Sequence, residues 1–244
     1  KIALQKTSQL KTPKEEQGTK TEFEGYGIVG VRWLGHACFE VKSEDVTVVT
    51  DPHDGVSIGL PEPRSKADIV LVSHMHFDHA GGIKLVAKKD AVIFKGEAGE
   101  WVEKGVRIKG ISSYHDDRGG RERGGNIIYA FEINGIRFCH LGDLGHILTL
   151  EQVKQIGDVD VLFIPVGGTY TIDAEGATKI VELLKPKIVI PMHYRIKGLS
   201  LPISDAKPFL KGKRNIERID SPEYEVSKET LPEKTKIVIL KPKL

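Results

Sequence analysis

The chain has 244 residues, of which 39% are hydrophobic and 29% are charged, a composition typical of a globular protein with its own core. Its net charge is only +2, from 36 basic and 34 acidic residues, so the totals do not favour a polybasic nucleic-acid binder. No apolar run reaches the roughly 18 residues that a membrane-spanning helix needs, and we expect no membrane partner.

The chain has two cysteines, Cys38 and Cys139, which are too few for a disulfide framework. The sequence therefore predicts a cytoplasmic protein with reduced thiols. The alternative is an exported protein whose signal peptide has been removed, since the chain begins at Lys1.

Residues 1–22 are polar and rich in Lys, Glu, Gln and Thr, and we expect an N-terminal arm with little to bury. Residues 23–244 are predicted to form a single domain, because no long linker, repeat or low-complexity block interrupts them. β-branched and apolar runs predict strands within 28–41, 46–49, 67–72, 91–95, 106–111, 126–133, 136–141, 159–166 and 187–190.

Helical patterns cover residues 149–156 and 173–184, and the first begins at a predicted capping box of Thr149 and Gln152. A shorter helix is expected after Gly81-Gly82, through Lys88.

Asn134-Gly135 between two predicted strands is the strongest hairpin signal in the chain. The C-terminal residues 216–244 hold two short strand-like pieces, the clearer over 236–240. Together these elements predict an α/β domain with mixed sheets and helices outside them.

Five of the nine histidines lie at or just beyond the end of a predicted strand, as does Asp143; they are His74, His76, His115, His140 and His193. Strand ends hold side chains on rigid supports and can bring together residues that are distant in the sequence. The pattern predicts a cluster of imidazoles and carboxylates, with His140 itself expected to be a buried, hydrogen-bonded core histidine.

The densest group of polar side chains is His74, His76, Asp78 and His79. Imidazole is a ligand suited to Zn²⁺, and carboxylate adds negative charge. In an extended chain His74 and His76 point the same way and can bind one ion, whereas Asp78 and His79 follow a turn and can face a neighbouring site. A polar loop that is His-rich by chance is the alternative, but it does not explain three histidines in six residues.

The run His74-Met75-His76-Phe77-Asp78-His79-Ala80-Gly81-Gly82 resembles the signature of the metallo-β-lactamase superfamily of hydrolases. Further matches follow in the family's order, at Thr50-Asp51-Pro52, His115, Leu141-Gly142-Asp143 and Pro191-Met192-His193-Tyr194. The resemblance spans about residues 27–194. It implies a four-layer αββα sandwich, in which two mixed β-sheets carry helices on their outer faces.

The resemblance also implies seven ligands for two divalent cations. The first ion would be bound by His74, His76 and His115, the second by Asp78, His79 and His193, and Asp143 would bridge the two. Zn²⁺ is the expected metal, although Mn²⁺, Fe or Ni²⁺ fit the same ligands. A hydroxide between the ions would be the nucleophile, with Asp78 and Asp143 as catalytic carboxylates that orient water or carry its proton.

Five other residues are candidates for contacts behind the ligands or with a substrate: Asp51, His36, Thr171, Tyr194 and Arg118. Asp51 matches the family's aspartate that braces the metal loop, and Arg118 lies in an Arg/Gly-rich loop beside His115, where arginine suits phosphate or carboxylate groups. The alternatives are a packed core side chain for His36, a Gly-rich turn for Thr171 and a solvated loop for Arg118.

A narrower resemblance links the segments 33–39, 167–171 and 191–194 to the branch that includes L-ascorbate-6-phosphate lactonase. This branch does not fix the substrate. For the chain as a whole we expect hydrolysis of a small-molecule ester, lactone or phosphoester, and a homo-oligomer is an open alternative.

A nuclease acting on nucleic acid, a di-iron oxidoreductase and a non-catalytic metal binder are the alternative functions. A nuclease would need a basic stripe, and only residues 118–125 and 207–214 offer basic clusters. Di-iron relatives resemble His-x-Glu-x-Asp, whereas the middle ligand here is His76. A complete set of seven ligands favours catalysis over mere metal binding.

Overall fold

The computed structural model describes residues 27–243, and the predicted arm over 1–22 lies outside these residues. The first sheet contains β1 (Val29–Gly35), β2 (Cys38–Lys42), β3 (Thr47–Thr50), β4 (Ala67–Val72), β5 (Ala87–Lys95) and β13 (Glu223–Val226). The second contains β6 (Gly99–Glu103), β7 (Val106–Tyr114), β8 (Gly125–Ile133), β9 (Ile136–His140), β10 (Val161–Pro165), β11 (Ile188–Met192), β12 (Ile216–Arg218) and β14 (Lys236–Ile239). The helices are α1 (Phe77–Ala80), α2 (Ile83–Val86), α3 (Leu150–Ile156), α4 (Ala174–Leu184) and α5 (Lys207–Leu210), with 3₁₀ turns η1 (Val56–Ile58) and η2 (Lys228–Thr230).

Both sheets are mixed, with strand orders β13-β1-β2-β3-β4-β5 and β12-β14-β11-β10-β9-β8-β7-β6. Hairpin-linked strands such as β7, β8 and β9 are antiparallel, whereas β9, β10 and β11, which are joined by crossovers through α3 and α4, are parallel. As a result β7, β9, β10 and β11 run in one direction and end at the same edge of the second sheet. In the first sheet β3 and β4 are parallel and also end together.

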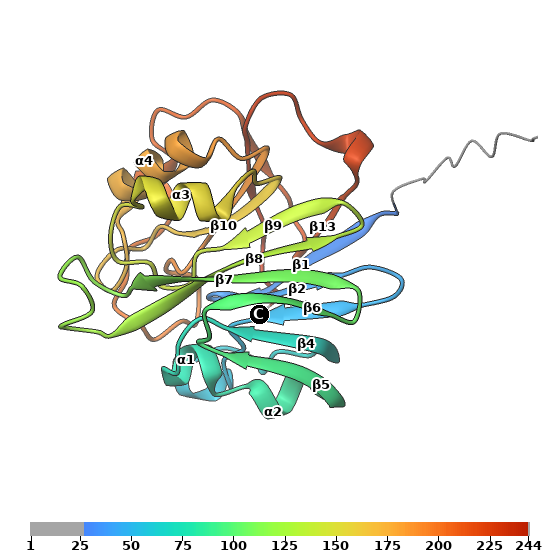
Figure 1. Cartoon of the computed structure of the whole chain (residues 1–244). Coiled ribbons are helices and arrows are strands. Elements are labelled where there is room, and N and C mark those ends of the chain that lie inside the picture. Colours follow the sequence, from blue (N-terminus) through green and yellow to red (C-terminus); the bar gives the residue numbers. More distant parts are fainter. Residues whose placement is uncertain (1–26, 244) are drawn as a thin grey trace, which may run out of the picture.

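The inner faces of the two sheets form the main core, which includes Trp33, Phe39, Phe138 and Phe163. The rings of Phe39 and Phe163 meet across it with centroids 4.3 Å apart. The helices α1 and α2 lie over the outer face of the first sheet, and α3 and α4 lie over the second (Figure 1). The predicted αββα sandwich is thereby confirmed.

Local sequence signals produced several elements where we predicted them. Thr149 and Gln152 form a complete capping box at the start of α3, and Asp173 caps α4 through a hydrogen bond from Gly176 N–H. Asn134 and Gly135 both have positive φ, at 50° and 71°, as the tight turn between β8 and β9 requires.

The predicted end of the short helix at Lys88 was wrong, because α2 stops at Val86 and Ala87 already belongs to β5. The strand pairing of β5 with β4 overrides the local preference of these residues. The short edge strand β6 was also missed, and the C-terminal residues form three strands rather than two. No helix among the described residues is long and apolar enough to cross a membrane.

Replacing Phe163 with alanine should lower the free energy of unfolding by about 3–5 kcal/mol, because the ring is fully buried between the sheets and leaves a cavity. Denaturant unfolding of the metal-free protein measures the change. Leu150→Ala is the control, since that side chain is 83% exposed on α3 and its loss should cost about 0.5 kcal/mol or less. Equal effects of the two substitutions would contradict this account of the core.

Candidate metal centre

The seven predicted ligands lie beyond the ends of four strands and meet at one edge of the sandwich. Four of them follow β4, namely His74, His76, Asp78 and His79. His115 follows β7, Asp143 follows β9 and His193 follows β11. Six of the seven side chains are buried, and His76 is exposed. Polar side chains of this kind are seldom buried without a partner, so their convergence indicates a functional site.

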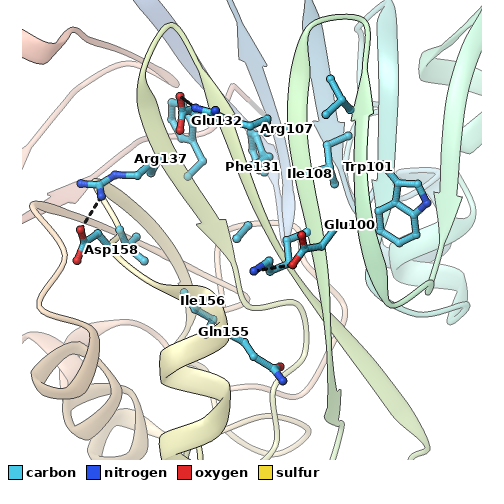
Figure 2. A pocket seen from close by; sticks show the side chains of 15 residues that line it. Glu100, Trp101, Arg107, Ile108, Phe131, Glu132, Arg137, Gln155, Ile156 and Asp158 are labelled. Carbon is cyan, nitrogen blue, oxygen red and sulfur yellow. Dashed lines mark hydrogen bonds and ion pairs between the residues drawn. The ribbon is translucent and has the colours of Figure 1, made fainter.

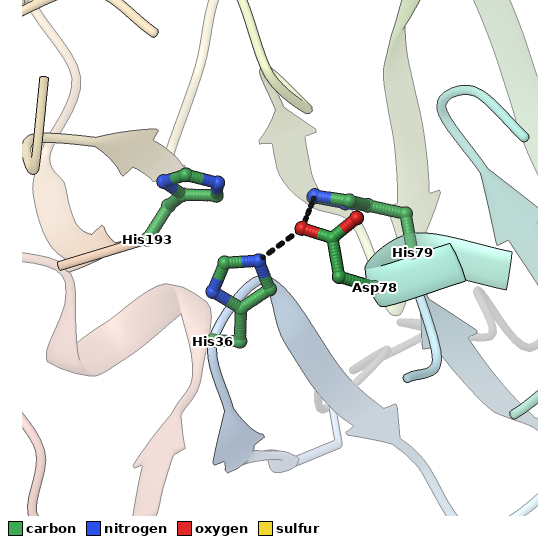
Figure 3. Close-up of side chains that lie close together, drawn as sticks. All are labelled: His36, Asp78, His79 and His193. Carbon is green, nitrogen blue, oxygen red and sulfur yellow. Dashed lines mark hydrogen bonds and ion pairs between the residues drawn. The ribbon is translucent and has the colours of Figure 1, made fainter. Parts of the chain in front are cut away.

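The donor atoms fall into overlapping groups, within each of which all atoms lie within 4.8 Å of one another. One group contains His74, His76 and His115. A second contains Asp78, His79 and His193 together with His36, which is shown in Figure 3. A third group joins one histidine of each set, His74 and His79, to Asp143. Two of the groups thus contain the two predicted sets, with His36 as an additional member, and the third connects them through Asp143.

Asp143 lies between the two sets of ligands. Its Oδ2 atom is 3.1 Å from Nε2 of His79, 3.1 Å from Nε2 of His115, 3.2 Å from Nε2 of His193 and 3.8 Å from Nε2 of His74. Two atoms bound to one tetrahedral zinc lie about 3.3 Å apart, given bonds of about 2.0 Å. The distances suit a carboxylate that shares ions with imidazoles from both sets.

Several of these buried atoms have no hydrogen-bond partner among residues 27–243; they are Nε2 of His74, His79 and His193 and Oδ1 of Asp143. His79 Nε2 lies close to Asp143 Oδ2 without forming a hydrogen bond to it. A buried polar atom without a partner costs about 1–3 kcal/mol. Divalent cations would provide that partner for the three imidazole nitrogens, so the residues fit a metal site.

The pKa values of the buried groups are shifted by burial and by one another. Burial, followed by a smaller effect of His79, lowers the pKa of His74 to about 3, which keeps the imidazole neutral and able to bind a metal. Burial opposes ionisation of Asp143, but the neighbouring His193 and His79 hold its pKa well below the usual range. Burial opposes protonation of His79, yet Asp143 and Asp51 raise its pKa well above 6.5, and a cation at Nε2 would take the place of that proton.

Asp51, at the end of β3, supports two of the histidines from behind. Its Oδ2 atom accepts hydrogen bonds from His79 Nδ1 at 2.8 Å and from the Ser73 hydroxyl at 2.7 Å. The same hydroxyl lies 2.9 Å from His74 Nδ1, from which it can accept a hydrogen bond. With Nδ1 held in this way, both imidazoles direct Nε2 to the site, the arrangement by which carboxylates orient metal-binding histidines.

The remaining supports come from groups that sequence reasoning missed. His115 Nδ1 donates to the backbone oxygen of Tyr170 at 3.0 Å, and Asn126 Oδ1 accepts the backbone N–H of Asp143 at 2.9 Å. Ser73 could have been noticed because it precedes His74 directly. A backbone carbonyl has no sequence signature, and the contact of Asn126 depends on the pairing of β8 with β9.

Two glycines allow the ligand loops to come this close. A Cβ atom on Gly82 would lie 2.0 Å from the backbone oxygen of His53, and one on Gly142 would lie 2.3 Å from Asn126 Oδ1. Both contacts are far shorter than any real Cβ allows. Glycine is thus required behind the His74–His79 loop and beside Asp143.

His36, Thr171, Tyr194 and Arg118, the other predicted contact residues, occupy different places. His36 lies inside the cluster, whereas the hydroxyl of Thr171 donates to the backbone oxygen of Ile172 at 3.0 Å. Tyr194 packs its ring on Trp33, with centroids 5.3 Å apart, in the core between the sheets. Arg118 has a side chain that is 69% exposed and pairs with Glu122 at 3.0 Å.

Two further histidines outside the ligand set, His140 and His53, are buried. His140 is hydrogen-bonded at both nitrogens, to Ala37 O at 2.8 Å and to Gly142 N–H at 3.1 Å, as expected of a core histidine. His53 lies in the loop after Asp51 and is fully buried, with Nε2 3.1 Å from Leu34 O. It is buried because the loop after Asp51 folds under the β1–β2 turn.

A separate cavity of about 410 Å³ lies over strands β6 to β9 beside the end of α3 (Figure 2). None of the predicted ligands lines it. Its charged side chains pair with one another, as Arg107 does with Glu132 at 2.6 Å and Arg137 with Asp158 at 2.8 Å. The cavity therefore provides no reactive group comparable to the His/Asp cluster.

Fold and site together define a class of protein. Residues 30–193 match the family model of the beta-lactamase superfamily domain, a segment that includes every predicted ligand. A metallo hydrolase of Ignicoccus hospitalis, 21% identical, shares the fold with a TM-score of 0.60 over 89% of this chain and 97% of its own. The chain is a metal-dependent hydrolase of the metallo-β-lactamase superfamily.

More similar relatives narrow the assignment. A UPF0173 metal-dependent hydrolase of Pyrococcus furiosus is 30% identical over 240 residues, which cover 88% of this chain and 97% of the relative. One of Thermoplasma volcanium is 32% identical over 191 residues, covering 68% and 83%. A protein of Thermotoga maritima with a crystal structure, described as a Zn-dependent hydrolase of the superfamily, is 38% identical in sequence to this chain. The two structures have a TM-score of 0.72, and the match covers 88% of this chain and all of the other. The chain belongs to the UPF0173 metal-dependent hydrolase family.

Replacing Asp51 with asparagine should weaken Zn²⁺ binding by about 10- to 100-fold, because an amide cannot accept the hydrogen bonds that orient His79 and Ser73 with the same strength. Competition with a chromophoric chelator measures the dissociation constants.

Asp54→Asn is the matched control, since this nearby carboxylate bonds only to Ser57 among the hydrogen-bonded partners in residues 27–243. Zinc affinity that is unchanged in Asp51→Asn would contradict the supporting role of Asp51.

Proposed function

We propose that this protein hydrolyses a small ester, lactone or phosphoester with two divalent cations held in the His/Asp cluster, Zn²⁺ being the expected metal. The observation that carries the proposal is the position of Asp143 Oδ2, which lies within 3.8 Å of four imidazole Nε2 atoms. A single carboxylate among imidazoles from two ligand sets is what a bridge between two ions needs.

The grouping of the donor atoms supports a division of the ligands into two sets, one for each ion. His74, His76 and His115 would hold the first ion, Asp78, His79 and His193 the second, and Asp143 both. Bound at this site, two cations supply an activated water near neutral pH and polarise the oxygen of the scissile group.

The chain's own carboxylates would handle the water and its proton. Asp143 Oδ1 is buried and has no hydrogen-bond partner among the described residues, so it is free to accept a hydrogen bond from a reacting water. Asp78 belongs to the second ligand set, and its Oδ2 atom lies 3.3 Å from His79 Nε2. These two carboxylates can orient the water and receive a proton during hydrolysis.

Two large apolar side chains support a substrate with an apolar portion. Met75 and Phe77 are 57% and 56% exposed, and they flank His76, the one exposed ligand. Burial of such side chains against a substrate would stabilise its binding. The resemblance to the lactonase branch places lactones among the first substrates to assay.

The arrangement of charges does not favour the nuclease alternative. Two of the three arginines in the loop after His115, Arg118 and Arg123, pair with Glu122 at 3.0 and 3.6 Å, which leaves Arg121 as the one arginine of this loop without an ion pair among the described residues. An electrostatic surface for a nucleic-acid backbone would instead present unpaired basic side chains beside the site.

Replacing His76 or Asp143 with alanine should lower metal-dependent hydrolysis by roughly 10³-fold or more, since each loss removes a ligand that holds or bridges the cations. Purified protein is assayed against lactones, esters, phosphodiesters and phosphorylated sugars, after chelation and again after addition of Zn²⁺.

His146→Ala is the control, because this histidine lies outside all three groups of donor atoms and bonds to Tyr114 N–H. Full activity of a folded Asp143→Ala protein shown to be metal-free would overturn the mechanism. Cleavage of RNA alone within the substrate panel would favour the nuclease.

Replacing Phe77 with alanine should raise KM by about tenfold for substrates with a large apolar group, which corresponds to the loss of about 1.4 kcal/mol of apolar contact. Steady-state kinetics on acetyl and longer acyl esters of the same alcohol measures the effect. Val102→Ala, at a 70% exposed position on β6, serves as the control. An equal change for acetyl and long-chain esters would contradict the apolar contact.

A further inference from the structure

His36 is a fully buried histidine that belongs to neither ligand set of the proposed function. It lies in the turn between β1 and β2 with φ at 54°, a left-handed conformation that is uncommon for a residue with a side chain. Figure 3 shows its ring beside Asp78, with His79 and His193 next to them. Asp78 and His193, two side chains of the second ligand set, therefore have His36 as an immediate neighbour.

The ring of His36 forms a hydrogen bond to Asp78. Its Nε2 atom lies 3.0 Å from Asp78 Oδ2, and the same oxygen lies 3.3 Å from His79 Nε2. His36 Nε2 is hydrogen-bonded to this oxygen, whereas His79 Nε2 has no hydrogen-bond partner among the described residues and is available to a cation. An ionised carboxylate can only accept a hydrogen bond, so this bond requires the proton to lie on His36 Nε2.

The backbone of His36 contacts a ligand of the opposite sheet. Its carbonyl oxygen accepts the backbone N–H of His193 at 3.2 Å and the indole N–H of Trp33 at 3.0 Å. The rings of His36 and His193 are also packed, with centroids 4.2 Å apart. One residue thus touches Asp78 after β4 and His193 after β11.

We propose that His36 is the positioning residue of the second metal site. Its Nε2–H occupies one lone pair of Asp78 Oδ2 and thereby sets the direction in which the carboxylate meets a cation. Its carbonyl oxygen fixes the backbone of His193. The inference rests on the proposed two-cation function, and it requires that affinity for the second ion, but not for the first, depends on His36.

The variants His36→Asn and His36→Gln test whether the second ion depends on a donor at the position of His36 Nε2. The amide nitrogen of glutamine falls near the position of a histidine Nε2, whereas that of asparagine falls near Nδ1 and cannot reach Asp78. Asparagine also tolerates the left-handed backbone. His53→Gln is the matched control, because His53 is equally buried but its ring bonds to the backbone oxygen of Leu34.

Each full-length protein is freed of metal and titrated with Zn²⁺ in competition with a chromophoric chelator, and bound Co²⁺ is followed by its absorption. His36→Asn should weaken the second ion by about 10- to 100-fold and leave the first within about twofold. His36→Gln should recover most of the second affinity, and His53→Gln should bind both ions as the wild type does.

If His36→Asn binds two ions with the dissociation constants of the wild type, the role of His36 is overturned but the proposed function is not. Equal weakening of both ions has the same consequence. A wild-type protein that binds only one ion would overturn the proposed function and this inference with it. Where the variants do not fold, long-range ¹H–¹⁵N spectra of the wild-type zinc protein decide the matter. A proton on His36 Nε2 supports the inference, and a proton-free Nε2 bound to zinc overturns it.

Discussion

The central constraint on this molecule is the desolvation of Asp143 and the imidazoles around it. Its Oδ2 atom is buried and lies 3.1–3.2 Å from three imidazole nitrogens that come from different loops. Removing a carboxylate from water is costly unless positive charge or hydrogen bonds replace the lost hydration. The histidines alone satisfy this requirement incompletely, because several buried donor atoms lack partners within residues 27–243. A cation site is the arrangement in which these groups stabilise one another.

The fold holds this unfavourable cluster in place through its strand directions. β7, β9 and β11 are all aligned in the second sheet, so their last residues lie at one edge, opposite the edge where β3 and β4 end in the first sheet. The aromatic core between the sheets fixes the distance across this gap. Asp51, Ser73 and the Tyr170 carbonyl then orient individual rings. Rigid support on one side leaves His76, Met75 and Phe77 exposed on the other, where a substrate can approach.

Elements with strong local signals were predictable, and elements that depend on partners were not. The helix over 173–184 and the turn at Asn134-Gly135 follow from apolar periodicity and from residues that accept a positive φ. The edge strand β6 has a weak pattern of its own, and it exists because it pairs with β7 along its full length. The short helices α1 and α2 are likewise held by the loop around Asp51 and by the outer face of the first sheet rather than by helical propensity.

The same division applies to the site. By itself the sequence determined the residue types and their order, because a histidine run at the end of a buried strand has few other uses and each further ligand sits beyond a strand. The structure alone decided how those strand ends converge, which makes His36 a neighbour of Asp78 although 42 residues separate them. It also decided that Asn126 holds Asp143 and that Tyr194 packs into the core. Such contacts depend on strand register and on the approach of two sheets, which no local pattern encodes, since one step along a strand turns a side chain to the opposite face.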